Sequence, residues 1–102
     1  VIITDDLTML EHSQIPEYAD RATNAIAALA AGNDVLLYVP GADFDAPALV
    51  SAIAAAVRSG QLSQTHIDES VARVLTLRRG LFPKAQTWMP PCDERCFIRV
   101  TY

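Results

Sequence analysis

The sequence has no apolar run long enough to cross a membrane and no excess of basic residues. Its apolar stretches fall well short of the ~20 residues that a spanning helix needs, and no basic segment precedes an apolar one as in a secretory signal. The 102 residues include 8 Lys and Arg against 12 Asp and Glu, a formal net charge of −4. Because nucleic acid and anionic membranes attract basic surfaces, we expect neither as a partner.

Cysteines and the patterns of metal or phosphate sites are also scarce. The two cysteines, Cys92 and Cys96, are spaced C-x3-C with no histidine after them, which supplies at most half of a zinc site. A local disulfide and two free thiols remain open alternatives. The sequence shows no Gly-rich phosphate loop and no serine–histidine catalytic set. We predict no metal and no cofactor.

Composition and length predict one domain or part of one. Hydrophobic residues make up 51% of the chain, which excludes disorder, and a domain of this length buries roughly 60–70% of its unfolded surface. The chain starts at Val1 and its first methionine is Met9, so we expect a piece of a longer polypeptide. We place the domain at residues 1–83 and predict that residues 84–102, with the only Trp and no helical period, form a tail of undefined order.

Apolar patterning predicts the order strand, helix, strand, helix, helix. The strands cover residues 1–4 and 35–39, and the second is continuously apolar, as in a strand covered on both faces. Pro16, a residue favoured in the first turn of a helix, precedes the first helix, and Gly32 ends it. Asp45 caps the second helix, and Thr65 begins a capping box for the third. The three helices are expected at residues 17–31, 46–59 and 65–80.

Two strands joined by one helix form a parallel, right-handed βαβ unit. By itself such a sheet has two open edges and apolar faces without a second layer. The pattern therefore requires neighbouring strands that this chain does not contain.

Two adjacent carboxylates, Asp5 and Asp6, follow the first strand. Catalytic groups of parallel α/β folds gather at the carboxyl ends of the strands, where a carboxylate is suited to act as a nucleophile, a base or a ligand. On position alone, an Asx turn or a solvated loop acid is the alternative. Among the other polar residues, we expect Asp34 to be a turn acid that bonds local amides, with a direct sugar contact as the alternative. We expect His12 to be a solvated loop residue and His66 to lie at the surface.

Three stretches carry a more specific pattern. They are VIITDDLTM at residues 1–9, AAGNDVLL at 30–37, and IDESVARVL at 67–75 followed by GLF at 80–82. In this order they resemble, over residues 1–83, the nucleophile strand, the entry to the last barrel strand and the closing helix of glycoside hydrolase family 3. The related β-glucosidase branch usually has a tryptophan after the first Asp, so Asp6 and Met9 favour the β-N-acetylhexosaminidase branch.

This resemblance implies an α/β fold, namely a fragment of a (β/α)8 barrel that contains its last two strands with their helices. It implies that Asp5 is the catalytic nucleophile and that Asp6 and Met9 bind the sugar. The implied carbohydrate substrate is a terminal β-N-acetylglucosaminide from peptidoglycan or chitin, hydrolysed with retention through a glycosyl–enzyme intermediate. Enzymes of this branch that recycle cell-wall sugars are typically cytoplasmic, and we predict the same compartment.

The acid/base group of the resembled enzymes, an Asp-His pair on an upstream loop, has no counterpart in this sequence. Two βα units of eight do not enclose a pocket, so we predict that these 102 residues alone are inactive. A second hypothesis is a non-catalytic interaction module that associates with a partner, or with copies of itself, through its open sheet edges.

Overall fold

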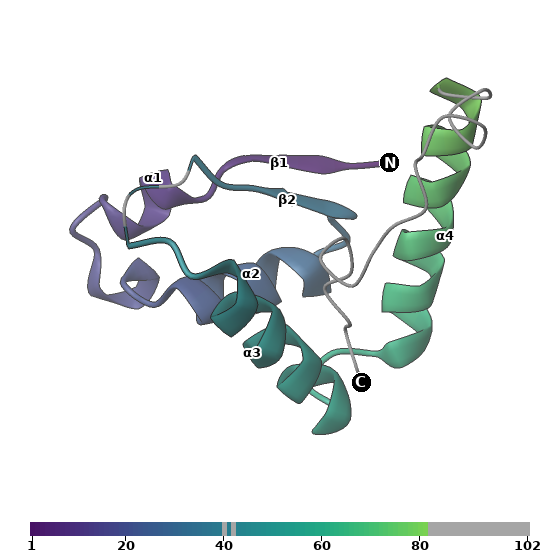
Figure 1. The fold of residues 1–102 in the computed structure, drawn as a ribbon. Helices are drawn as coiled ribbons and strands as arrows, with labels where there is room; N and C mark the ends of the chain where they lie inside the picture. The colour runs from purple at the N-terminus through teal and green to yellow at the C-terminus, as the bar shows by residue number, and fades with distance from the viewer. Residues whose placement is uncertain (40, 42, 82–102) are drawn as a thin grey trace.

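The computed structural model describes residues 1–39, 41 and 43–81 and shows an α/β arrangement (Figure 1). Within these ranges the strands and the longer helices follow the predicted order, and a short helix and a 3₁₀ turn come after the first strand. None of the helices in the described ranges is long and apolar enough to span a bilayer. In chain order the elements are β1 (Ile3–Asp6), α1 (Thr8–Glu11), η1 (Pro16–Tyr18), α2 (Arg21–Ala30), β2 (Val35–Leu37), α3 (Ala46–Arg58) and α4 (Gln64–Leu81).

The two strands form a parallel sheet, which confirms the predicted strand direction. The register pairs Ile3 with Val35 and Asp6 with Leu37. Between these two pairs, β1 therefore contains one residue more than β2. An extra residue in one strand disrupts the main-chain ladder locally, as in a β-bulge. Past this irregularity the main chains bond again, since the Leu7 N–H donates to the Leu37 carbonyl oxygen at 3.0 Å.

β1 ends two residues later than predicted, so both carboxylates lie inside the strand instead of after it. Side chains account for the extension. The Leu37 N–H donates to the Thr4 hydroxyl oxygen at 2.9 Å, and the Val39 N–H donates to the Asp6 carboxylate at 3.0 Å. These two side chains continue the pairing of β1 with β2 past the irregularity.

The first long helix begins at Arg21, four residues later than predicted. Asp20 is its cap, because its carboxylate accepts the Thr23 N–H at 2.7 Å. Pro16, which suggested the helix start, instead opens the 3₁₀ turn η1. The predicted end is confirmed, since Gly32 follows the helix with φ +105°, a left-handed conformation that suits glycine.

The cap of the second long helix is confirmed and that of the third is wrong. Asp45 accepts the Ala48 N–H at 2.9 Å and so caps α3. Helix α4 begins at Gln64, and the hydroxyl that accepts an N–H at its start belongs to Ser63, which bonds the His66 N–H at 3.3 Å. Thr65 lies inside the helix. Ser63 is also a favoured capping residue, and the capping-box pattern alone did not distinguish the two positions.

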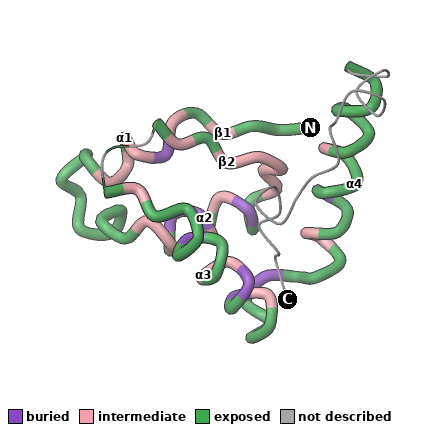
Figure 2. The backbone as a smooth tube through the Cα atoms, in the orientation of Figure 1, coloured by how far each residue is buried: buried purple, intermediate pink, exposed green. Residues whose placement is uncertain are grey.

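The core lies where α2, α3 and the start of α4 meet beneath the sheet (Figures 1 and 2). Leu29 from α2, Ala56 from α3 and Leu62 from the turn before α4 are buried together, and Leu62 is only 2% exposed. Partly buried neighbours complete the cluster: Ile26, Leu36, Ile53, Val57 and Ile67.

The strands are largely uncovered, as predicted for a two-stranded sheet without a second layer. Ile3 in β1 and Leu37 in β2 are 57% and 44% exposed, and Val39, two residues after β2, is 62% exposed. The apolar run at residues 35–39, which suggested a strand covered on both faces, is not covered on both faces by the described residues. Helices α2 and α3 lie on one side of the two-stranded sheet (Figure 1), and no second layer among the described residues covers the other side. With its exposed apolar strands, the described part is compatible with a partial α/β domain.

Candidate functional site

Asp5 presents its carboxylate to solvent near the carboxyl end of β1. Successive side chains of a strand point to opposite sides, and here Asp5 is exposed while Asp6 is half-buried. The Asp6 N–H donates to Oδ1 of Asp5 at 2.7 Å, which orients this carboxylate relative to the strand. An exposed, oriented carboxylate at the carboxyl end of a parallel strand has the position expected of a nucleophile.

Asp6 is bonded to the protein through both carboxylate oxygens. Its Oδ1 accepts the Thr8 N–H and the Val39 N–H, each at 3.0 Å, and its Oδ2 accepts the Thr8 hydroxyl at 2.6 Å. The Thr8 hydroxyl and then the Val39 N–H lower the pKa of Asp6 below its ordinary value, and the nearby His12 adds to the effect. Asp6 is therefore ionised at neutral pH and links the carboxyl ends of β1 and β2.

Met9 lies in the short helix α1, directly after β1, and its side chain is 62% exposed. The helix starts at Thr8, whose contacts with Asp6 set where it leaves the strand. All three residues predicted for the site therefore lie at one end of the sheet. Asp5 and Met9 offer exposed side chains there, and Asp6 makes contacts within the protein.

A cluster that the sequence analysis missed fixes α1 beside α2. The Glu11 carboxylate accepts the Arg21 guanidinium in a forked pair, with Nε–Oε1 at 2.9 Å and Nη2–Oε2 at 2.8 Å. The same guanidinium lies 5.2 Å from the centre of the Phe44 ring, which packs 5.3 Å from the ring of Tyr38. Burial raises the pKa of the Tyr38 phenol. Glu11 and Arg21 are ten residues apart, and no helical or strand period relates them.

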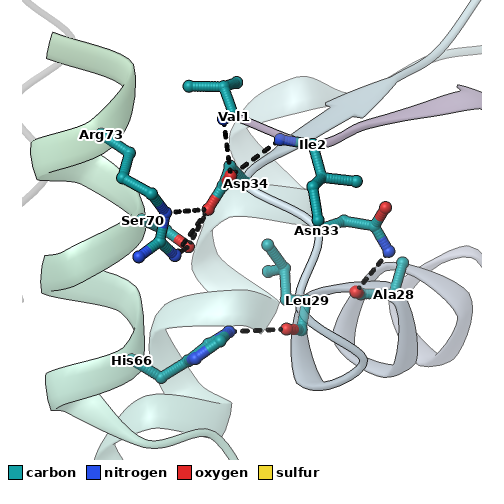
Figure 3. Close-up of polar contacts among 9 residues, drawn as sticks. All are labelled: Val1, Ile2, Ala28, Leu29, Asn33, Asp34, His66, Ser70 and Arg73. Carbon is teal, nitrogen blue, oxygen red and sulfur yellow. Dashed lines mark hydrogen bonds and ion pairs between the residues drawn. The ribbon is translucent and has the colours of Figure 1, made fainter. Parts of the chain in front are cut away.

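Asp34 organises the opposite, amino end of the strands (Figure 3). Its side chain is only 2% exposed and accepts the Ile2 N–H at 2.8 Å, the Ser70 hydroxyl at 2.6 Å and the Arg73 guanidinium at 2.8 Å. Arg73 first, then Ser70 and the Ile2 N–H, hold the pKa of Asp34 far below its ordinary value. The expectation of a turn acid bonding local amides is wrong, since these partners are 32 to 39 residues away.

The two histidines differ in their surroundings. His12 is exposed, as expected. His66 is half-buried, and its Nε2 lies 3.1 Å from the Leu29 carbonyl oxygen at the end of α2 (Figure 3), so it is less exposed than the surface position expected for it. A bond to a carbonyl requires the proton on Nε2. His66 therefore joins α4 to the end of α2.

In the described ranges, no three His, Cys, Asp or Glu side chains are grouped as ligands of a metal ion. Cys92, Cys96 and the predicted tail at 84–102 lie outside the described residues. The described end of the sheet offers an exposed, oriented carboxylate, Asp5, next to a second carboxylate, Asp6, that the protein already bonds.

A family model described as "Glycosyl hydrolase family 3 N terminal domain" matches residues 1–77 of the chain. The matched range contains both strands and most of the helices, and it includes Asp5, Asp6 and Met9. No curated protein and no solved structure matches the chain significantly.

Proposed function

The chain belongs to glycosyl hydrolase family 3, and from this membership we propose that it carries the nucleophile of a retaining β-N-acetylhexosaminidase. The nucleophile is Asp5. The observation that supports this assignment is the exposed carboxylate of Asp5 at the carboxyl end of a parallel strand, with Oδ1 held by the Asp6 N–H at 2.7 Å. Met9, exposed on α1 at the same end, borders the sugar.

The proposed reaction is the hydrolysis of terminal β-N-acetylglucosaminides. One Asp5 oxygen attacks the anomeric carbon while the glycosidic oxygen leaves with a proton, which gives a covalent glycosyl–enzyme intermediate. Water then attacks the same carbon and releases the sugar with its configuration retained. The attacking carboxylate must be ionised and correctly oriented, and the hydrogen bond from the Asp6 N–H orients it.

We also propose that this chain is part of a (β/α)8 barrel and is inactive alone. A barrel of this kind takes about 250 residues, and its strands are covered on both sides. The exposed apolar side chains of Ile3, Leu37 and Val39 support this proposal, because strands of this composition normally pack against neighbours. The group that protonates the leaving oxygen would come from the missing units.

The test is hydrolysis of an aryl N-acetyl-β-glucosaminide, with the aryl β-glucoside as a comparison substrate. It uses the 102-residue chain and the complete reading frame that encodes it, each with Asp5→Asn and with Asp68→Asn, an exposed acid on α4, as the matched control. We expect turnover only in the complete protein, its loss in Asp5→Asn, and its retention in Asp68→Asn. Full activity in Asp5→Asn would refute the nucleophile assignment, and turnover by the short chain would refute its predicted inactivity.

A second candidate function is self-association through the open sheet, a non-catalytic role. The exposed residues Ile3 in β1 and Ile2 just before it, at 57% and 58%, favour it. Sedimentation of the chain should then show a dimer or larger species at micromolar concentration that Ile3→Lys dissociates, because a charge on a strand surface opposes pairing. A monomer across that concentration range would exclude this role.

A further inference from the structure

We propose that Asp6 is a positioning residue, which aims the Asp5 carboxylate through the peptide group that joins the two residues. The inference rests on the proposed role of Asp5 as nucleophile. Its starting point is the 2.7 Å hydrogen bond in which the Asp6 N–H donates to Asp5 Oδ1. Whatever fixes the plane of that peptide also fixes the direction of the Asp5 carboxylate.

The Asp6 side chain is what fixes the peptide. One of its oxygens accepts the N–H groups of Thr8 and Val39, and the other accepts the Thr8 hydroxyl. The first and third bonds hold Asp6 to the start of α1, and the Val39 bond reaches 33 residues along the chain to the end of β2. The residue that follows the nucleophile is thereby tied to two separate elements.

The irregular sheet explains why a side chain is needed here. Between Ile3 and Asp6 the register with β2 shifts, and directly after Asp6 the Leu7 N–H donates to the Leu37 carbonyl oxygen at 3.0 Å. The main-chain pairing here is irregular, and the Asp6 carboxylate adds a side-chain bond to it. Val39 lies beyond the end of β2, and its N–H bonds a carboxylate instead of a strand carbonyl. Without the Asp6 carboxylate, the stretch that carries Asp5 would lose its bond to Val39.

The same geometry leaves room for the sugar contact predicted for Asp6. An ionised carboxylate offers about four acceptor sites, and three of them are used within the protein. A sugar contact by Asp6 would have to use the remaining site. Asp6 and Asp5 point to opposite sides of the strand, so their two negative charges are not directed at one another.

The experiment measures backbone order at residues 5 and 6 of the 102-residue chain by ¹⁵N relaxation. The variants are Asp6→Ala, which removes all three bonds, and Asp6→Asn, whose side-chain oxygen and NH₂ can still bond Val39 and Thr8. Thr4→Val is the matched control, because Thr4 also accepts a β2 N–H, from Leu37 at 2.9 Å, but has no bond to Asp5. In the wild type we expect order parameters of about 0.85, the value of a rigid backbone.

The expected result is that Asp6→Ala lowers the order parameter of the residue 6 amide below about 0.6, while Asp6→Asn restores it and Thr4→Val leaves it rigid. The proposal is overturned if Asp6→Ala leaves this amide rigid, or if Thr4→Val loosens it equally, since the effect would then be general strand pairing. If Asp6→Ala does not fold, Thr8→Val decides. It removes the 2.6 Å hydroxyl bond, and an unchanged amide would overturn the proposal.

These outcomes do not depend on activity, so a chain that hydrolyses nothing still tests the positioning role. In the complete protein, a displaced nucleophile should cost about 100-fold in kcat with little change in KM, and Asp6→Asn should recover part of that loss. Activity lost in Asp5→Asn but unchanged in Asp6→Ala would support the proposed function and overturn the positioning role.

Discussion

Replacing Ser70 by alanine tests what holds α4 against the strands. Ser70 is 3% exposed, and its hydroxyl donates to Asp34 at 2.6 Å while accepting the Arg73 guanidinium at 3.1 Å. The carboxylate that it bonds is almost fully covered, with 2% of its side chain exposed. The Ser70→Ala variant would leave this carboxylate with one fewer donor in a place that water barely reaches.

The magnitude follows from the partners that remain. A hydrogen bond to a charged group stabilises a fold by about 1.5–3 kcal/mol, and alanine regains up to about 0.5 kcal/mol of helix propensity over serine. Arg73 still donates to the carboxylate through Nε and Nη2, so the buried charge keeps its main partner and loses one of its hydrogen bonds. We expect the free energy of unfolding to fall by about 1–2 kcal/mol.

The assay is urea unfolding followed by far-UV circular dichroism. With a denaturant slope of about 1–3 kcal/mol per molar, the midpoint should fall by roughly 0.3–2 M. Ser51→Ala is the control, because Ser51 is an exposed position in α3, where a change of no more than about 0.5 kcal/mol is expected. Equal midpoints for the two variants would refute the reasoning that the buried hydroxyl bond holds α4.

Two further predictions concern pH and a helix end. Asp34 and Asp20 both have pKa values below the ordinary 3.8. The stability that their ionised forms contribute is therefore present above pH 3.8 and is lost as the pH falls below it. When the free energy of unfolding is measured across an acid titration, Asp34→Asn should lose less stability with falling pH than the wild type does. If Asp34→Asn and wild type lose stability in parallel, Asp34 is not the group responsible. Gly32→Ala should destabilise the fold by about 1–2 kcal/mol because φ is +105° there, whereas Gly80→Ala, in helix α4 with open space around it, should be neutral or stabilising. Thermal unfolding of the pair distinguishes them, and equal melting temperatures would contradict the backbone argument.

Local patterns predicted those features that depend on a few neighbouring residues. The order of the strands and long helices, the cap at Asp45 and the stop at Gly32 were all readable, because capping and turn residues act within about four positions of themselves. The same local rules misplaced the start of α2, since Pro16 suits the first turn of a 3₁₀ segment as well as of a helix. They also chose Thr65 over Ser63 for α4.

The site shows the same division. The resemblance of the segment around Asp5 pointed to the family that the comparison then showed, and to one end of the sheet as the place to look. The network around Asp6 was not predictable, because its partner Val39 is 33 residues away and the bond exists only through a shift in strand register. The forked pair of Glu11 and Arg21 follows no sequence period either.

By itself, then, the sequence determined the family, the succession of elements and the carboxylates at the strand end, since each is encoded in contiguous residues. Only the tertiary structure decided which side chains those carboxylates meet. Asp34 accepts hydrogen bonds that connect the strands to α4, and Asp6 accepts one that connects the ends of the two strands. The packing of the helices and the register of the sheet bring these distant donors to the two carboxylates. Hydrogen bonds across more than thirty residues are properties of that packing, which no local pattern encodes.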